Sequence, residues 1–387
     1  MHELISPALR ELQTVAQAVT DEVIAPNAAR VDEEARWPRE SMAALADANL
    51  MGLHVPTRLG GHGQGLLALA LLSETIARGC SSSALCFGMH CVGSAVIASK
   101  ATAFHEQQYL VPIAENKHLT TLALSESGTG SHFYLPQTRL SRDGDYFEVN
   151  GTKQFVTNGG HADSYVISTQ VSGQATDAGD FSCLIVDRDR PGMSWLDAWH
   201  GLGMRGNSSR GLQLEQLRVP VANLLGEEGD QIWYVFEVVA PFFLTAMAGT
   251  YLGLAEAALQ DAVTHLRRRV YQHSGQSLAD VSLLQVRLAE MKLRVEKCRA
   301  LLYQAAFRGD QGRADTALHL MMAKADAADT ATWVTNEAMS LGGGQAYREN
   351  GPQGRRLRDA RAGHVMSPTT DLLKTWIGRQ LLDLPLL

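Results

Sequence analysis

The chain has 387 residues, of which 45% are hydrophobic and 19% are charged, an ordinary balance for a globular protein with a substantial core. Its formal net charge of −7 gives no support for binding to nucleic acid or to an anionic membrane. The five cysteines are scattered and form no CxxC pair, so we expect a reduced, cytoplasmic protein without a disulfide framework or a metal site.

Residues 1–120 carry a helical pattern. Their first segment, MHELISPALRELQTVAQAV, is amphipathic and contains acids, which is not the composition of a signal peptide. There and in SMAALADANLMGL the apolar residues recur at spacings of three and four, which predicts helices. After a Pro- and Gly-rich loop at 56–65, the segment LLALALLSETIARG predicts a buried helix that ends at Gly79. We therefore expect an N-terminal α-helical domain.

Residues 121–225 have a different pattern. The segments DYFEVNGTKQFVTNG, SYVISTQV, FSCLIVDRD and LQLEQLRVP are short and rich in β-branched and aromatic residues. Gly, Asn and Asp separate them at the spacing of strands and turns. This region is therefore predicted to be a small β domain.

Residues 226–387 are helical again. A long apolar segment, WYVFEVVAPFFLTAMAGTYLGLAEAALQDAVTHLRRRV, precedes SLLQVRLAEMKLRVEKCRALLYQAAF and TALHLMMAKADAADTATWVTNEAMSL. Three such helices and the tail are expected to pack as an antiparallel bundle. Because no run of about 20 apolar residues is free of charge, no membrane span is predicted. The expected fold class is α+β, mainly α.

Three glycine-containing loops are candidates for ligand binding. GLGMRG (201–206) matches GxGxxG, but it lies in the β region and not in a βαβ unit, so it does not indicate a Rossmann domain. ALSESGTGSHFYLPQT (123–138) can bring N–H and hydroxyl groups to an anion or a flat ring, or it is a tight turn. In KQFVTNGGHADSYVI (153–167), Thr157 can hydrogen-bond a ligand, and the Asn-Gly pair at 158–159 also suits a β-hairpin.

The order of these segments resembles the acyl-CoA dehydrogenase family. ALSESGTGS, GTKQFVTNG and GLGMRGNSSRGLQLEQLRVPVANLLGEEG are followed by LGGGQAYRENGPQGRRLRDAR, and the resemblance covers nearly the whole chain. It implies an N-terminal α-helical domain, a central β-barrel-like domain and a C-terminal four-helix bundle. It also implies one FAD per subunit of a homodimer or homotetramer. The substrate would be an acyl thioester on CoA or on a carrier protein, and electrons would pass to an electron-transfer flavoprotein or to oxygen.

The resemblance also assigns residues to FAD. Leu122, Leu124 and Ser125 would meet the flavin edge, and Gly130 and Ser131 would meet the pyrophosphate. Phe155 and Thr157 would back the ring. Phe155 stands where the family usually has tryptophan, which keeps an apolar face and removes an N–H donor.

Further contacts are implied across a subunit interface and beside the catalytic position. Gly343 and Gly344 would meet the adenosine half of FAD in a neighbouring subunit. Arg269 would reach the pyrophosphate across the same interface, although HLRRRVYQHSGQSL is longer by two residues than the family pattern. Thr369 matches the threonine that touches FAD beside the catalytic residue.

The family's catalytic base is missing from both positions where it is expected. Dehydrogenation removes a proton from Cα and a hydride from Cβ, and the weakly acidic Cα proton calls for a carboxylate in a dry pocket. Alignment on RDA (358–360) puts that position at Ser367. The alternative position on the long helix falls on Phe243, and its usual arginine neighbour is replaced by Leu244. Together with Phe242, these apolar residues indicate a partly filled substrate pocket, and hence a short or branched acyl group.

Ser367 also has a purely structural interpretation. In SPTTD, serine at the N-cap and proline at the first helical position make a good helix start. The N–H groups of such a start can still favour negative charge on a bound substrate. Serine itself has too high a pKa to act as the base unaided.

Other residues are candidates for the base, each with a structural alternative. Asp371 follows Ser367 by one helical turn, where an acid often only complements the helix dipole. His90 lies on an apolar helix that would face the substrate cavity, although a lone histidine there is more often a core residue. The remaining candidates are Glu126, whose family counterpart is structural, His132 and His364.

Three functions are compatible with this pattern. The leading hypothesis is an FAD-dependent oxidoreductase that acts on the CH–CH group of an acyl thioester with a non-standard base. The second is a flavin-dependent monooxygenase or an eliminating enzyme on the same fold. The third is a non-catalytic protein that binds FAD or acyl groups.

Overall fold

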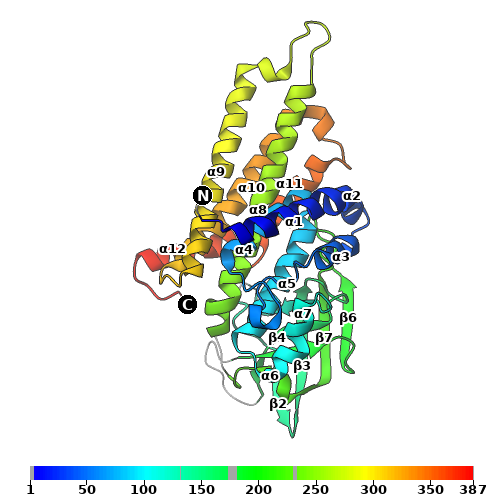
Figure 1. Cartoon of the computed structure of the whole chain (residues 1–387), viewed down its shortest axis with the longest axis vertical. Coiled ribbons are helices and arrows are strands. Elements are labelled where there is room, and N and C mark those ends of the chain that lie inside the picture. Colours follow the sequence, from blue (N-terminus) through cyan, green and yellow to red (C-terminus); the bar gives the residue numbers. More distant parts are fainter. Residues whose placement is uncertain (1–3, 131, 173–180, 230–232, 387) are drawn as a thin grey trace.

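The computed structural model describes residues 4–130, 132–172, 181–229 and 233–386. Helices form both ends of the chain, strands form its middle, and the longest helices run along the long axis of the molecule (Figure 1). The predicted fold class is confirmed, with a helical N-terminal part, a central β part and a C-terminal helical bundle.

The N-terminal part packs its most apolar helices inside the molecule. α4 ends at Gly79 as predicted and packs on α8 and α9 of the C-terminal part, while α5 packs on α8 and strand β1. Both helices are apolar on nearly all sides because they are surrounded in this way. The helices are α1 (Pro7–Val19), α2 (Ala25–Glu33), α3 (Arg39–Asp47), α4 (Leu66–Gly79), α5 (Ser81–Ser99), α6 (Ala103–His105) and α7 (Val111–Ala114).

The central part is an eight-stranded sheet in the order β6-β7-β3-β2-β4-β5-β8, with β1 parallel to β4. Residues from both halves of the sheet share one core that includes Phe147, Ile167, Leu184 and Leu214, which makes the domain barrel-like. Since β2 separates β3 from β4, the Asn-Gly pair at 158–159 does not close a β-hairpin. The strands are β1 (Thr120–Ala123), β2 (Arg139–Asp143), β3 (Tyr146–Val156), β4 (Ser164–Val171), β5 (Ser182–Asp187), β6 (Met193–Ala198), β7 (Arg210–Pro220) and β8 (Leu224–Leu225).

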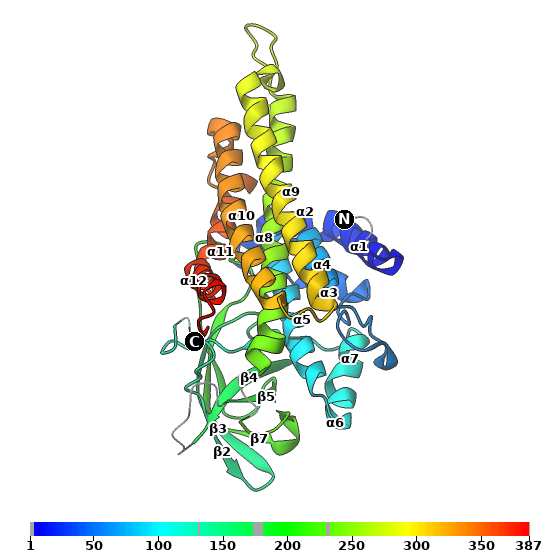
Figure 2. The ribbon, with the colours of Figure 1, turned by 90° about the vertical axis from the view of Figure 1, so that its left-hand side faces the viewer.

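The C-terminal helices are arranged about α10, which packs on α8, α9, α11 and α12. Figure 2 shows the long helices α8, α9 and α10 side by side. Gly253 lets α8 approach α4, since a Cβ atom there would lie 2.1 Å from the carbonyl oxygen of Glu74. The helices are α8 (Ala240–Arg268), α9 (Ser282–Asp310), α10 (Thr316–Ala346), α11 (Pro352–Val365) and α12 (Thr370–Leu381).

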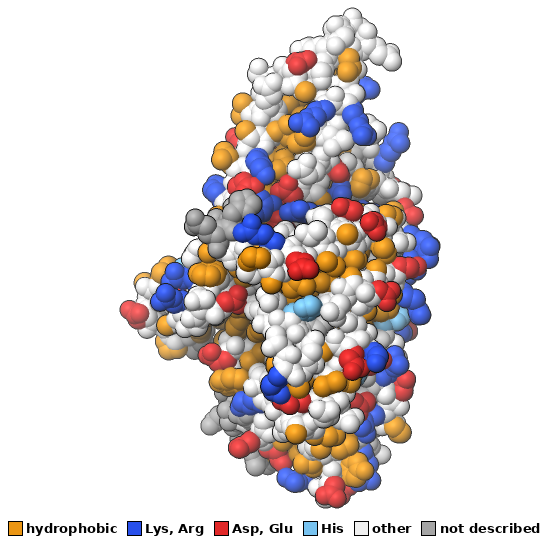
Figure 3. Space-filling view, viewed as in Figure 1, with side chains coloured by type: hydrophobic (Ala, Val, Ile, Leu, Met, Phe, Trp, Pro, Cys, Tyr) orange, Lys and Arg blue, Asp and Glu red, His pale blue; other side chains and the backbone are white. Residues whose placement is uncertain are grey.

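Two helical segments, Ser81–Ser99 and Tyr234–Arg268, are long and apolar enough to cross a membrane by length and composition. Their apolar windows are 94% and 78% buried inside the structure, which is the position of core helices. On the face in Figure 3, acidic and basic side chains are interspersed, in keeping with the modest net charge.

Candidate active site

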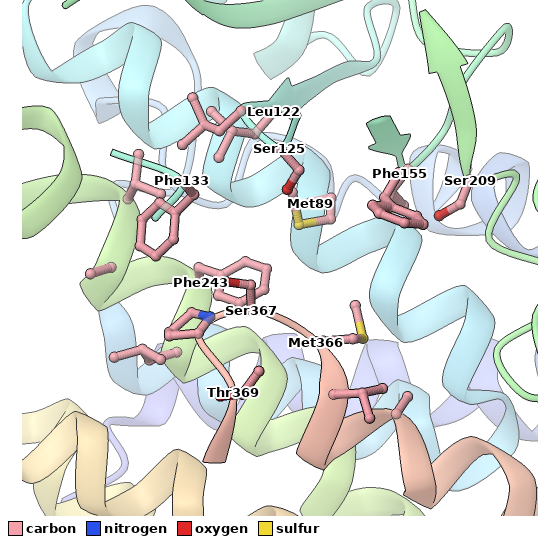
Figure 4. Close-up of a pocket in the computed structure, with 18 of the residues that line it drawn as sticks. Met89, Leu122, Ser125, Phe133, Phe155, Ser209, Phe243, Met366, Ser367 and Thr369 are labelled. Carbon is pink, nitrogen blue, oxygen red and sulfur yellow. The ribbon is translucent and has the colours of Figure 1, made fainter. Parts of the chain in front are cut away.

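A cavity of about 1010 Å³ lies between the β domain, α5, the start of α8 and the connection from α11 to α12. Its size is at the upper end of the range of about 300–1,000 Å³ that is usual for small-molecule sites. Ser125 and Phe155 lie on one side of it and Ser367 and Thr369 on the other (Figure 4).

Phe155 faces the cavity because strand β3 is irregular at this point. The pairing of β3 with β7 shifts register between Lys153 and Val156, and Phe155 has a φ of 55°. A bulge of this kind redirects a side chain out of the regular alternation of a strand. The Phe155 ring is 55% exposed and meets the edge of Trp199 at a centroid distance of 5.8 Å.

The other residues expected to meet a flavin edge and pyrophosphate gather on the same side. Leu122, Leu124 and Ser125 come from the end of β1, and Gly130 and Thr157 come from the two loops quoted above; all five line the cavity. Gly130 has a φ of 53°, and a Cβ atom there would meet no atom within 4 Å, so the backbone is open to a ligand. The prediction for Ser131 lies outside the described residues.

Glu126 is the only carboxylate among the described residues that line the cavity, and it is fully engaged. Its Oε1 accepts hydrogen bonds from Lys153 Nζ at 2.6 Å and from Thr138 Oγ1 at 2.7 Å, and its Oε2 accepts one from the Gln137 amide at 2.6 Å. Burial opposes ionisation, but the charge and hydrogen bond of Lys153 outweigh it and lower the pKa of Glu126. Glu126 is therefore an ionised structural partner of buried Lys153.

The connection between α11 and α12 corrects the predicted helix start. α12 begins at Thr370, and its N-cap is Thr369, whose side chain accepts a hydrogen bond from the Leu372 amide at 3.3 Å. Ser367 lies in the connection between the two helices. Met366, with extended backbone angles, follows the end of α11, and α12 does not start until Thr370. The Ser367 hydroxyl is buried on the cavity wall and has no hydrogen-bond partner in the described part of the chain.

The wall beside Ser367 is apolar. Phe243 and Leu244, at the alternative base position, line the cavity. Met89 of α5 and Met366 line it as well. Such a surface excludes water and strengthens electrostatic interactions inside the cavity.

His90 and Asp371 are not brought into the cavity. The helix that carries His90 does face the cavity, through Met89, but the His90 ring is fully buried and is not among the lining residues. Its Nε2 donates to the Met51 carbonyl at 3.0 Å, and its Nδ1 accepts from the Thr120 amide at 3.1 Å. Burial lowers the pKa of His90 to about 4, so the ring is a neutral core residue. Asp371 is exposed in the first turn of α12 and lies outside the cavity lining.

The two remaining histidine candidates are also absent from the cavity lining. His132 is exposed and meets the ring of Tyr134 edge-on. His364 Nε2 is 2.9 Å from Asp329 Oδ1, and its Nδ1 is 3.3 Å from Thr332 Oγ1, so both nitrogens have partners on α10.

Arg269, Gly343 and Gly344 lie far from the cavity of their own chain. Arg269 is the C-cap residue of α8, and Gly343, with a φ of 56°, lies at a kink near the C-terminal end of α10. The C-terminal ends of α8 and α10 are remote from the β domain (Figure 1). Because the resemblance assigns these residues to the site of a neighbouring subunit, their role stays a prediction.

Sequence reasoning missed a junction that shapes one end of the cavity. The Met204 amide donates to Asp359 Oδ1 at 2.6 Å, and Arg358 donates to the Leu202 carbonyl at 2.8 Å and to Asp32 Oδ1 at 3.1 Å. The GLGMRG loop is thereby joined to α11 and α2. The RDAR motif marked α11, but nothing in the sequence paired it with that loop.

Three family models match consecutive parts of the chain. They are "Acyl-CoA dehydrogenase, N-terminal domain" at residues 6–117, "Acyl-CoA dehydrogenase, middle domain" at 121–217 and "Acyl-CoA dehydrogenase, C-terminal domain" at 244–382. Together they cover most of the chain and both sides of the cavity.

Individual proteins agree with these matches. A cyclohex-1-ene-1-carbonyl-CoA dehydrogenase of Geobacter metallireducens is 33% identical over 375 residues, which cover 96% of this chain and 97% of that protein. A probable acyl-CoA dehydrogenase of Bacillus subtilis, YngJ, is 30% identical over 381 residues, with coverages of 96% and 98%. The structure of butyryl-CoA dehydrogenase from Megasphaera elsdenii has a TM-score of 0.92 at 26% identity and covers 97% of this chain and 98% of its own.

Proposed function

Since this chain belongs to the acyl-CoA dehydrogenase family and is an FAD-dependent flavoprotein oxidoreductase, we propose that it oxidises the Cα–Cβ bond of an acyl thioester with a non-standard base. One observation supports the non-standard base most directly. The cavity wall has an unpartnered serine hydroxyl, from Ser367, where the family's carboxylate is expected, and its one carboxylate among the described residues, Glu126, is bound to Lys153.

The residues present suit FAD. Phe155 offers an aromatic face that is half exposed, Ser125 and Thr157 offer hydroxyls, and the backbone at Gly130 is open. When bound, FAD accepts the hydride that leaves Cβ. Aromatic and hydroxyl groups on rigid strand ends hold a flat ring in one orientation, which is what hydride transfer requires.

The residues on the opposite wall bind and activate the acyl group. Phe243, Leu244 and Met89 exclude water and leave room for a short or branched chain. The Ser367 hydroxyl offers a hydrogen bond to a polar group of the substrate, because it has no partner in the described chain. The N-terminal end of α12, beside Thr369, favours the negative charge that develops on the thioester oxygen as the Cα proton leaves.

The nature of the substrate follows from the missing base. Serine cannot take the Cα proton unaided, since its pKa is far above that of a carboxylate. We therefore propose a thioester whose Cα–H is acidified by a second electron-withdrawing group, because such a proton needs less help from the protein. The products are the α,β-unsaturated thioester, reduced FAD that holds the hydride, and one proton, which leaves Cα and reaches solvent.

An anaerobic titration of the flavin-loaded protein tests this reaction. The panel contains butyryl-CoA, a branched saturated acyl-CoA and acyl-CoA thioesters that carry an electron-withdrawing group next to Cα. We expect the flavin absorbance to bleach with the acidified thioesters and far more slowly with butyryl-CoA. An artificial electron acceptor should then restore the absorbance.

The same experiment separates the alternative functions. A flavin-dependent monooxygenase is supported if no thioester bleaches the flavin anaerobically but an aerobic assay with externally reduced flavin yields an oxygenated thioester. Release of a leaving group without a net change in flavin absorbance supports an eliminating enzyme. A protein that shows none of these activities with any thioester is a binding protein, and the proposed oxidation is then wrong.

We also propose a cytoplasmic homodimer or homotetramer. The five cysteines are all buried and none of them forms a disulfide, which suits a reducing compartment. Arg269, Gly343 and Gly344 lie away from their own cavity, so a contribution to FAD requires a second copy of the chain. Light scattering of the purified protein measures the assembly, and a monomer that retains FAD contradicts it. Paired assays with CoA and carrier-protein thioesters, and with an electron-transfer flavoprotein or oxygen, identify the partners.

A further inference from the structure

Lys324, in the N-terminal third of α10, has an unusual environment for a charged side chain. Its side chain is 0% exposed, and its Nζ donates to three backbone carbonyls. The distances are 2.8 Å to Gly363, 2.9 Å to Pro368 and 3.4 Å to Met366. An ammonium group has three N–H donors, so each donor has one of these acceptors.

All three carbonyls belong to the connection that carries Ser367. Gly363 lies in the last turn of α11, where carbonyls lack partners within the helix, and Met366 and Pro368 lie in the irregular segment that follows. A buried carbonyl without a partner is costly, and a lysine near a helix C-terminus can satisfy it. Lys324 therefore replaces the regular hydrogen bonds that this segment cannot make.

Two opposing effects act on the charge of Lys324. Burial lowers its pKa to about 7, and the charge of Asp329 partly counteracts this. The negative end of the α11 dipole also favours the ammonium form. Close packing holds the two helices together here, since a Cβ atom on Gly363 would lie 2.9 Å from that of Ala328. The amine is therefore held within hydrogen-bond distance of the Gly363 and Pro368 carbonyls.

We propose that Lys324 is a positioning residue that sets the course of residues 363–368 and thereby the place of Ser367 and Thr369 on the cavity wall. The segment has few other constraints. Thr370 Oγ1 donates to the Gly363 carbonyl at 3.3 Å, and Tyr251 Oη donates to Met366 Sδ at 3.3 Å. His364, within the segment, also binds Asp329 at 2.9 Å and Thr332 at 3.3 Å on α10. None of these contacts reaches Pro368 or Ser367, so among the described residues it is the Lys324 amine that joins α10 to Pro368.

Lys324→Met is the test, with Lys374→Met as the matched control. Methionine keeps the length and packing of the side chain but donates no hydrogen bond. Lys374 lies on α12 and pairs with Asp329 Oδ2 of α10 at 2.9 Å, while His364 binds the other oxygen of that carboxylate. The control therefore removes a neighbouring ammonium group and keeps the contact of His364. Hydrogen exchange of the flavin-loaded proteins, resolved by peptide, is the main measurement. We expect the amides of 363–369 to exchange about tenfold faster or more in Lys324→Met, with those of α8 unchanged and Lys374→Met like the wild type.

Two further measurements distinguish positioning from general stability. The absorbance spectrum of the bound flavin should shift in Lys324→Met and not in Lys374→Met, since Ser367 and Thr369 line its cavity. With a thioester that bleaches the wild-type flavin, Lys324→Met should lower the rate of bleaching by a larger factor than it lowers the affinity for the thioester. Hydrogen exchange needs no turnover, so this inference can fail or hold independently of the proposed reaction.

Each remaining outcome contradicts the assignment. Unchanged exchange at 363–369 in folded Lys324→Met shows that the amine does not hold the segment. Exchange that rises equally in α8 and α10 shows a general core residue. If Lys324→Met does not fold, Lys324→Gln, which keeps two N–H donors on a shorter side chain, replaces it with the same expectations at smaller amplitude. Failure of both variants to fold also contradicts a local role.

Discussion

The backbone amide of Met204 donates a 2.6 Å hydrogen bond to Oδ1 of Asp359, which fixes the glycine-rich loop between β6 and β7 to helix α11. The loop fits closely, since a Cβ atom on Gly203 would lie 2.4 Å from the backbone of Arg358. Two motifs that lie far apart in the sequence, GLGMRG and RDAR, thus form one end of the cavity.

Asp359→Ala should destabilise this junction more than Asp359→Asn. Alanine leaves the buried Met204 amide without an acceptor, which costs about 1–3 kcal/mol, whereas asparagine keeps a side-chain oxygen. Urea unfolding of both variants measures the difference. Equal stability of the two variants would show that the hydrogen bond contributes nothing.

Glu126→Gln should destabilise the protein by roughly 3–5 kcal/mol, because it leaves the charge of Lys153 buried and unpaired. The double variant Glu126→Gln/Lys153→Met should recover part of this loss, since it removes both charges. Denaturant unfolding tests both. A Glu126→Gln protein that is fully stable but no longer bleaches with thioesters would instead identify Glu126 as the base.

Ser367→Glu should create activity toward ordinary saturated acyl thioesters. A carboxylate at this position supplies the base that butyryl-CoA needs, and general-base catalysis contributes about 10²–10⁴-fold. The measurement is the anaerobic rate of flavin bleaching, and Ser367→Ala is the control for a change in cavity size alone. No gain in a variant that retains FAD means that the base position is not at residue 367.

Phe155→Ala should weaken FAD binding by about tenfold, because the aromatic ring lines the cavity. The fold should stay intact, because the side chain is half exposed. Titration of the apoprotein with FAD measures the affinity. Phe104→Ala is the matched control, as Phe104 is also partly exposed but lies outside the cavity lining. Equal affinities for the two variants would remove Phe155 from the flavin site.

His90 should make the protein sensitive to mild acid. Its pKa is lowered by burial to about 4, below the ordinary value of 6.5. Below about pH 6.5, His90 is protonated in the unfolded chain but still neutral in the folded chain. The free energy of unfolding therefore falls as the pH drops from about 6.5 to about 4. The loss is on the order of 3 kcal/mol from this group.

His90→Gln tests this dependence, since glutamine does not titrate. The slope of unfolding free energy against pH between 6.5 and 4 should become shallower, without vanishing. His54, whose pKa burial also lowers to about 4, still contributes to the slope in this variant. An unchanged slope would mean that His90 takes up its proton without unfolding.

Local patterns in the sequence were sufficient for the architecture. The all-round apolar segments became the buried helices α4 and α5, and the short β-branched runs became the strands of the central domain. Leu122, Ser125 and Thr157, which the motifs singled out as flavin-loop residues, line the cavity. These features depend on side-chain periodicity and on motifs of a few residues, which a sequence displays directly.

By itself, then, the sequence determined the fold class, the family and the absence of a carboxylate at residues 367 and 243. Only the tertiary structure decided that Thr369 rather than Ser367 caps α12 and that His90 is a neutral core residue. It also decided that Lys324 holds the connection beside the cavity. The last two depend on groups brought together from distant positions: His90 and Met51 are 39 residues apart, and Lys324 and Pro368 are 44 apart. Burial and hydrogen bonding of a polar group are set by such contacts, which no local pattern encodes.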